Sequence, residues 1–124
     1  MSENIPNSSV TIGPSADDGP VFRAAISGAT SGNNTLVAAI TGTRIRVLAL
    51  HIQAAGDVAV RFEDGAGGDP LTGVMSVNAE SGITLPYCGC GWFQTTAAAL
   101  LNMELGGAVQ VSGCLLYQKI KANA

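Results

Sequence analysis

Charged and aromatic side chains are both scarce in this chain. Asp, Glu, Lys and Arg together make up 12% of its 124 residues, and Phe, Trp and Tyr make up 5%. Because about a quarter of the residues in a globular domain are usually charged, a monomer of this composition would expose an unusually neutral surface. We therefore expect a homo-oligomer whose subunits cover part of that surface. A compact monomer with a Ser/Thr-rich surface is the alternative.

Positive charge is also limited, with six Lys and Arg residues against nine Asp and Glu. Residues 1–20 hold three acidic residues and no basic one, which leaves a body with six charges of each sign. Nucleic-acid binding requires a basic footprint, so we expect no nucleic-acid partner. No apolar run approaches the length of a membrane span, and the N-terminal residues lack a secretory signal pattern. Because no segment is long and apolar enough to span a membrane, we also predict no membrane partner.

Metal-binding and nucleophilic side chains are few: one histidine, His51, and three cysteines, Cys88, Cys90 and Cys114. A single imidazole excludes sites with two histidine ligands, and no nucleophile stands beside it in sequence, so we predict a hydrogen-bonded structural histidine. Cys88-Gly-Cys90 lacks the C-x-x-C spacing of zinc ribbons and redox motifs. We interpret both thiols as small buried hydrophobic groups. The odd number of cysteines, without a secretory signal, indicates reduced thiols made in a cytoplasm.

Motifs for phosphate, calcium or acyl chemistry are missing as well. Gly65–Gly68 is not followed by Lys and Ser or Thr, and no Gly-x-Ser-x-Gly is present. Acidic residues gather near this glycine-rich loop without the alternating ligands of an EF-hand, which favours ordinary turn residues; they are Asp57, Glu63, Asp64 and Asp69. We therefore predict that the protein is not an enzyme and has neither cofactor nor metal. Trp92 and Phe93 are expected to fill the core.

What the chain does contain is a series of short apolar or alternating segments separated by turn residues. The predicted strands are 21–27, 35–41, 43–54, 58–63, 71–77, 83–85, 101–105 and 109–118. Residues 55–57 and 106–107 are expected to close hairpins. Residues 95–98 are expected to form one helical turn or a loop. Strands at this spacing predict an all-β protein, a jelly-roll-like antiparallel β-sandwich over residues 21–124.

The longest predicted strand has an unusual pattern. Its alternation fails from Leu48 onward, where apolar residues continue on the face that carried two arginines. A strand covered on both faces need not alternate. We therefore expect this strand to lie in the intersheet core or near an oligomer axis, with its second half also covered by a neighbouring subunit. The candidate interface residues are Arg44, Arg46, Leu48, Leu50 and Ile52.

Residues 1–20 are predicted to be an extended N-terminal arm, because they hold three prolines and few apolar side chains. Val10 and Ile12 alternate around a threonine and are the candidate anchors on a partner. This pattern is compatible with an arm that docks on a partner and equally with an unattached arm.

Residues 25–118 resemble small structural proteins of tailed-bacteriophage heads. A Pro-aromatic corner leads to Gly-Trp-Phe, a Leu-Asn-x-x-Leu strand follows, and a Val-x-Gly-x-Leu-x-Tyr pattern closes the domain. The segments that carry the resemblance are 31–39, 43–48, 82–87, 91–95, 101–105 and 109–117. The Cys-Gly-Cys insertion departs from the family pattern.

The resemblance implies a capsid decoration, or cement, protein. Such proteins are β-rich, are commonly homotrimers, and bind the major capsid protein at three-fold positions outside the head. The implied location is the virion surface, after synthesis in the host bacterial cytoplasm. One alternative is a tail- or fibre-associated module that binds host glycans or joins virion parts. A jelly-roll metalloenzyme would need more ligands than one histidine allows.

Overall fold

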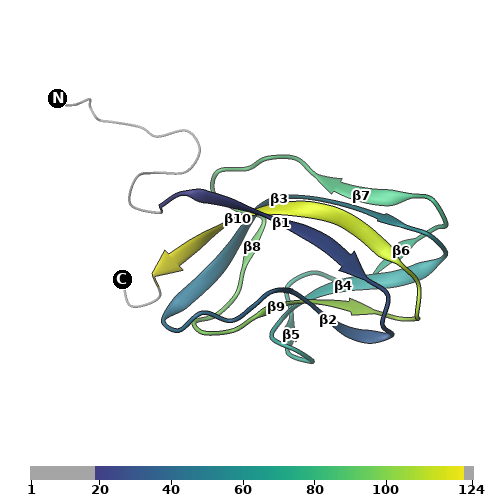
Figure 1. Cartoon of the computed structure of the whole chain (residues 1–124), viewed down its shortest axis with the longest axis horizontal. Coiled ribbons are helices and arrows are strands. Elements are labelled where there is room, and N and C mark those ends of the chain that lie inside the picture. Colours follow the sequence, from purple (N-terminus) through teal and green to yellow (C-terminus); the bar gives the residue numbers. More distant parts are fainter. Residues whose placement is uncertain (1–18, 122–124) are drawn as a thin grey trace.

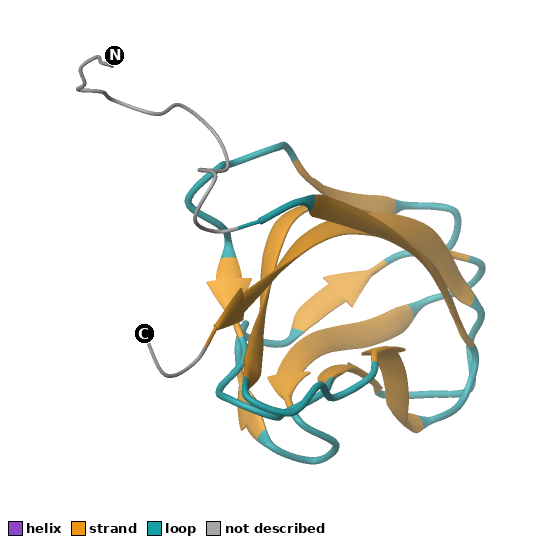
Figure 2. Ribbon diagram, turned by 60° about the vertical axis from the view of Figure 1, so that its left-hand side comes forward, coloured by secondary structure: helices purple, strands orange, loops and turns teal. Residues whose placement is uncertain are grey.

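Ten β-strands and no α-helix occupy the described part of the chain, residues 19–121 of this computed structural model (Figure 1). The strands are β1 (Val21–Gly28), β2 (Gly32–Val37), β3 (Thr43–Ala54), β4 (Val58–Asp64), β5 (Asp69–Pro70), β6 (Met75–Val77), β7 (Gly82–Leu85), β8 (Phe93–Gln94), β9 (Leu101–Leu105) and β10 (Val111–Lys121). They form two five-stranded antiparallel sheets that pack face to face, as Figure 2 shows. Sheet A has the order β1-β10-β3, with β7 and β8 both paired to β3. Sheet B has the order β2-β9-β4, with β5 and β6 both paired to β4.

The strand pairing is nested around the middle of the chain. β1 pairs with β10, β2 with β9, β3 with β7 and β8, and β4 with β6. A chain that doubles back once and is then rolled across two sheets is a jelly roll. The predicted all-β jelly-roll sandwich is therefore confirmed. Of the predicted arm, residues 1–18 lie outside the described residues.

Both predicted hairpins are wrong. β3 belongs to sheet A and β4 to sheet B, so residues 55–57 cross from one sheet to the other, and residues 106–110 do the same between β9 and β10. Ile52 and Val60 are both fully buried in the core between the sheets. Alternation of apolar residues fits two strands that face each other across a core as well as two that pair side by side, so the pattern alone did not distinguish them.

Some strand boundaries also differ from the prediction. β2 begins at Gly32 rather than Thr35, because the two asparagines predicted to form a turn lie within the strand. The Asn34 amide donates to the backbone oxygens of Thr30 (2.9 Å) and Gly32 (3.1 Å). The segment predicted as 71–77 forms a strand only at Met75–Val77, and residues 95–98 form no helix. Side-chain hydrogen bonds to nearby backbone, which are common in turns, therefore also occur inside a strand here.

The irregular pattern of β3 has a local cause, a β-bulge at Leu48. In the pairing with β10, Leu116 faces Ala49 and Tyr117 faces Val47, which leaves Leu48 as one extra residue. An extra residue reverses the alternation beyond it, so Val47 before the bulge and Leu50 after it are both buried in the core. Beyond the bulge the alternation resumes, with one face of β3 in the intersheet core as predicted and His51 exposed on the other. Cover of that second face by a neighbouring subunit stays a prediction.

The core between the sheets is built from the inward residues of both layers. Phe62 is fully buried at its centre and stacks on Phe93, with 5.6 Å between the ring centroids. The prediction that Trp92 also fills the core is wrong, because 46% of its surface is exposed. Phe93 is the first residue of β8, whereas Trp92 lies in the bend before that strand.

We expect Gly113→Ala to destabilise the fold by about 3 kcal/mol, the upper end of the usual cost of overpacking, because a Cβ without space forces the two strands apart. A Cβ on Gly113 would overlap the backbone oxygen of His51 on β3. Gly107→Ala is the matched control, since its Cβ would meet nothing within 4 Å. Urea unfolding of both variants measures the difference, and equal stabilities would contradict this account of the β3–β10 contact.

Candidate functional site

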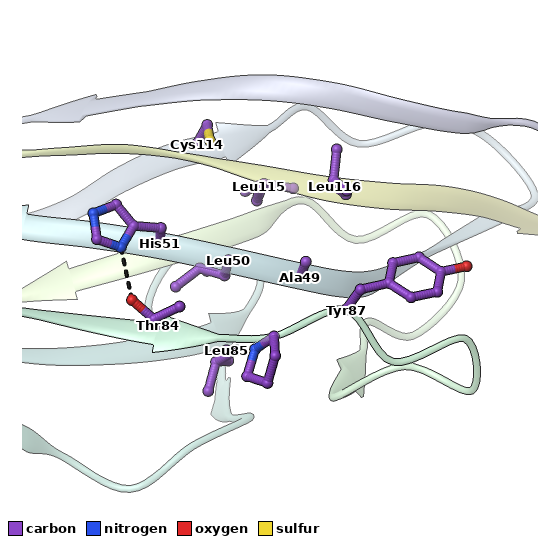
Figure 3. Close-up of a pocket in the computed structure, with 10 residues that line it drawn as sticks. Ala49, Leu50, His51, Thr84, Leu85, Tyr87, Cys114, Leu115 and Leu116 are labelled. Atoms are coloured by element: carbon purple, nitrogen blue, oxygen red, sulfur yellow. Dashed lines mark hydrogen bonds between the residues drawn. The ribbon is translucent and has the colours of Figure 1, made fainter. Parts of the chain in front are cut away.

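A shallow apolar groove of about 280 Å³ lies on the outer face of sheet A (Figure 3). It runs between β3, β10 and the segment that begins with β7. Its lining residues are Ala49, Leu50, His51, Thr84, Leu85, Pro86, Tyr87, Cys114, Leu115 and Leu116. The outer face of an antiparallel sheet is usually polar when it faces water, so an apolar groove there is a candidate binding surface.

The groove exists because β7 stops short. β7 pairs with β3 only from Leu50 to Gln53, and Pro86, which has no N–H to donate, follows its last residue. At one end of the groove His51 Nδ1 lies 2.8 Å from the hydroxyl of Thr84. The predicted hydrogen bond of His51 is therefore present. The groove thus offers apolar contact with one imidazole–hydroxyl pair at its rim.

Segment 86–92 forms the edge of this surface and is fastened to the bulged part of β3. Cys88 N–H donates to the Leu48 oxygen, and Trp92 N–H donates to the Val47 oxygen, both at 2.8 Å. Trp92 Nε1 also donates to the Pro86 oxygen at 2.7 Å. Tyr87 and Trp92 are 49% and 46% exposed. Sequence reasoning missed this aromatic pair, although the proline and the glycines around it already indicated a segment outside the regular strands.

The fold buries three of the candidate interface residues and leaves two others partly exposed. Leu48, Leu50 and Ile52 are at most 2% exposed, so their apolar surfaces are already covered within one chain. They are removed from the candidate surface, except that Leu50 contributes to the groove floor. Arg44 and Arg46 remain partly exposed on β3, and Arg46 Nε donates to Gln94 Oε1 at 2.8 Å. Val10 and Ile12 lie outside the described residues.

The charged residues are divided unevenly between the two sheets, although the chain after residue 20 holds equal numbers of acidic and basic residues. The strands of sheet A contain no Asp or Glu and carry five of the six basic residues: Arg23, Arg44, Arg46, Lys119 and Lys121. The strands of sheet B contain four acidic residues and one basic residue: Glu63, Asp64, Asp69, Glu104 and Arg61. The basic residues gather where β3 begins and β10 ends. By the pairing register, Arg23, Arg44 and Arg46 lie on the same face of sheet A as the groove. Lys119 instead pairs with the buried Ile45, and its amino group lies over the Phe22 ring on the opposite face.

The two thiols of segment 86–92 lie close together. Cys88 Sγ and Cys90 Sγ are 3.1 Å apart. The hydrogen bond from the Cys90 thiol, followed by backbone amides, lowers the pKa of Cys88. The same contact and the charge of Cys88 raise the pKa of Cys90. The interpretation of both thiols as buried hydrophobic groups is wrong, because Cys90 is exposed and Cys88 only half-buried.

Glu63 and Asp64, two of the acidic residues near the glycine-rich loop, have structural partners. Asp64 accepts hydrogen bonds from the backbone and hydroxyl of Thr96 (3.0 and 3.2 Å). Glu63 is fully buried; it is paired with Arg61 and accepts from Asn102 Nδ2 at 2.8 Å. Within residues 19–121, no group of three or more His, Cys, Asp or Glu side chains is arranged to hold a metal ion.

No known protein-family model matches this chain, and no curated protein matches it either. In the part of the chain that the structure describes, no helix is long and apolar enough to cross a membrane.

We expect Glu63→Gln to lower the free energy of unfolding by about 2 kcal/mol, because the amide replaces an acceptor and leaves buried donors unpaired. Arg61 Nε donates to Glu63 at 2.9 Å and would lose this charged partner. Asp69→Asn is the control, since Asp69 is exposed and surface changes usually stay within about 0.5 kcal/mol. Thermal unfolding compares the two variants; a Glu63→Gln variant as stable as the control would contradict the role of this network.

Proposed function

We propose that this chain is a decoration (cement) protein of a tailed-bacteriophage head. It binds the outside of the assembled shell as a homotrimer and stabilises the lattice of the major capsid protein. The resemblance of residues 25–118 to small phage head proteins suggests this function, and the jelly-roll fold is compatible with it. The observation that carries the proposal is the outer face of sheet A, where an apolar groove adjoins two exposed aromatic side chains.

Two physical features of sheet A suit a protein partner. The groove, together with Tyr87 and Trp92, provides the apolar and aromatic contacts that dominate the centres of protein interfaces. The basic residues near it, with no acidic residue on the same strands, favour an acidic surface on the partner. We propose that the occupant is an acidic, partly apolar region of the major capsid protein on the assembled shell.

Stabilisation follows from selective binding. A protein that binds the assembled shell but not the free capsid subunit lowers the free energy of the assembled state by mass action. No catalytic step is needed, and no covalent bond changes. Many copies, each making one modest contact, together raise the temperature or denaturant concentration at which the shell comes apart.

A glycan-binding tail or fibre module is the second candidate. The exposed pair Tyr87 and Trp92 favours it, because an aromatic face beside a groove can stack on a sugar ring. Binding of the isolated protein to host-surface glycans, with no binding to shells, would support this candidate over decoration.

We expect Ala49→Glu to weaken binding to shells at least about tenfold, which corresponds to about 1.4 kcal/mol. The substitution fills the groove and places a negative charge on the positive sheet. Ser76→Glu is the matched control, because Ser76 is exposed on β6 of sheet B. Co-sedimentation with shells assembled from the major capsid protein of the same phage measures binding. Equal binding by both variants, or no binding by the unaltered protein, would contradict the proposal.

Removal of residues 1–18 tests the proposed arm. We expect weaker binding to shells and an unchanged trimer. In analytical ultracentrifugation the full-length chain should show three times its 12.5 kDa mass, and the shortened chain three times its own smaller mass. The deletion stops at residue 18 because the Gly19 oxygen accepts a hydrogen bond from the buried Gln118 side chain at 3.1 Å. Undiminished binding would contradict the role of the arm, and a monomeric full-length chain would contradict the trimer.

A further inference from the structure

Cys88 and Cys90 lie in a tight turn that brings their thiols together. The turn is closed by the Gly91 N–H, which donates to the Cys88 oxygen at 3.0 Å, and Gly91 has a φ of +87°. The sulfur atoms are 3.1 Å apart, with one glycine between the two cysteines. Nothing in the proposed decoration function uses this pair.

We propose that Cys88 and Cys90 form a reversible dithiol–disulfide couple that exchanges with low-molecular-weight disulfides such as glutathione disulfide. A disulfide needs its sulfurs about 2.05 Å apart and its Cα atoms about 4.4–6.8 Å apart. In a straight strand, residues i and i+2 are about 6.6–6.8 Å apart, at the limit of that range. A turn shortens this separation, so the bond requires a movement of only about 1 Å between the sulfurs.

The surroundings assign different roles to the two thiols. Hydrogen bonding from Cys90 and from backbone amides favours the thiolate of Cys88, and the thiolate is the attacking form. The same contact keeps the proton on Cys90. Cys88 is therefore the attacking residue and Cys90 the resolving one. Arg46 lies close to this turn, where its charge favours the Cys90 thiolate once the Cys88 charge has been consumed.

The exchange balances in two steps. The Cys88 thiolate attacks one sulfur of glutathione disulfide, forms a mixed disulfide and releases one glutathione thiolate. Cys90 then loses its proton to solvent and attacks Sγ of Cys88, which forms the intramolecular disulfide and releases the second glutathione. The protein loses two electrons and two protons, and glutathione disulfide is reduced to two glutathione molecules.

Such a bond would form and break reversibly and would add little to the stability of the fold. A loop of three residues removes little entropy from the unfolded chain, in contrast to long disulfide loops, and exposed disulfides are usually the readily reduced ones. The turn is held at both sides by backbone hydrogen bonds to β3. The change on oxidation therefore falls on the residues between these anchors and on Tyr87 and Trp92 beside the groove.

The experiment equilibrates the full chain in glutathione buffers that range from reducing to oxidising. We expect two of the three thiols to disappear in one transition, with a loss of two hydrogens in the intact mass and no attached glutathione. Fluorescence of Trp92, the single tryptophan, should change over the same range of potentials. Persistence of three free thiols, or glutathione on each cysteine independently, would overturn the proposal.

Three serine variants separate the roles. We expect Cys90→Ser to accumulate one glutathione on Cys88, and Cys88→Ser to react at least about tenfold more slowly, because the activated thiolate is missing. Cys114→Ser is the control and should form the disulfide as the unaltered chain does, since Cys114 lies on β10. Equal rates for Cys88→Ser and Cys90→Ser, with the fold verified by circular dichroism, would overturn the assignment.

Discussion

The ladder between β3 and β10 is the interaction on which the rest of this fold depends. β10 holds β1 on its other edge, and β3 holds β7 and β8 on its own, so sheet A exists only if these two strands pair along their full length. The approach is close enough that Gly113 has no room for a side chain against β3. The bulge at Leu48 lets both halves of β3 turn their apolar side to sheet B. Segment 86–92, which borders the groove, is fastened to the same place.

The fold class could be predicted from the sequence because alternation and turn spacing are local signals, and they correctly placed β1, β3, β7 and β9. Strand partners could not, because alternation does not reveal whether two consecutive strands pair or face each other across the core. The break at Leu48 had two explanations, double-sided cover and a bulge, and only the pairing partner distinguishes them. Leu50 and Ile52 were therefore assigned to the outer face of β3, although the bulge turns both into the core.

The candidate site was only partly visible in the sequence, for a different reason. Counting charges gives six of each sign after residue 20, but which sheet carries each charge depends on how the strands alternate between layers. Trp92 was placed in the core on hydrophobicity alone, whereas its indole N–H bonds to the Pro86 oxygen and its ring remains half-exposed. The C-x-C spacing indicated two thiols on one side; they are brought together by a turn that the hydrogen bond from the Gly91 N–H to the Cys88 oxygen closes. Sheet A therefore combines three features that linear patterns show only separately: an apolar groove, a positive surface and a pair of thiols.

The nested pairing has a consequence for biosynthesis. Val21 pairs with Gln118, so the first strand leaves the ribosome almost one hundred residues before its neighbour has been translated. Only the central strands, such as β4 and β6, have partners close by in the nascent chain. Contacts of such long sequence separation form slowly, and an unpaired strand is vulnerable to wrong association while it waits. β1 therefore cannot pair with its neighbour in sheet A until Val111–Lys121 has been translated.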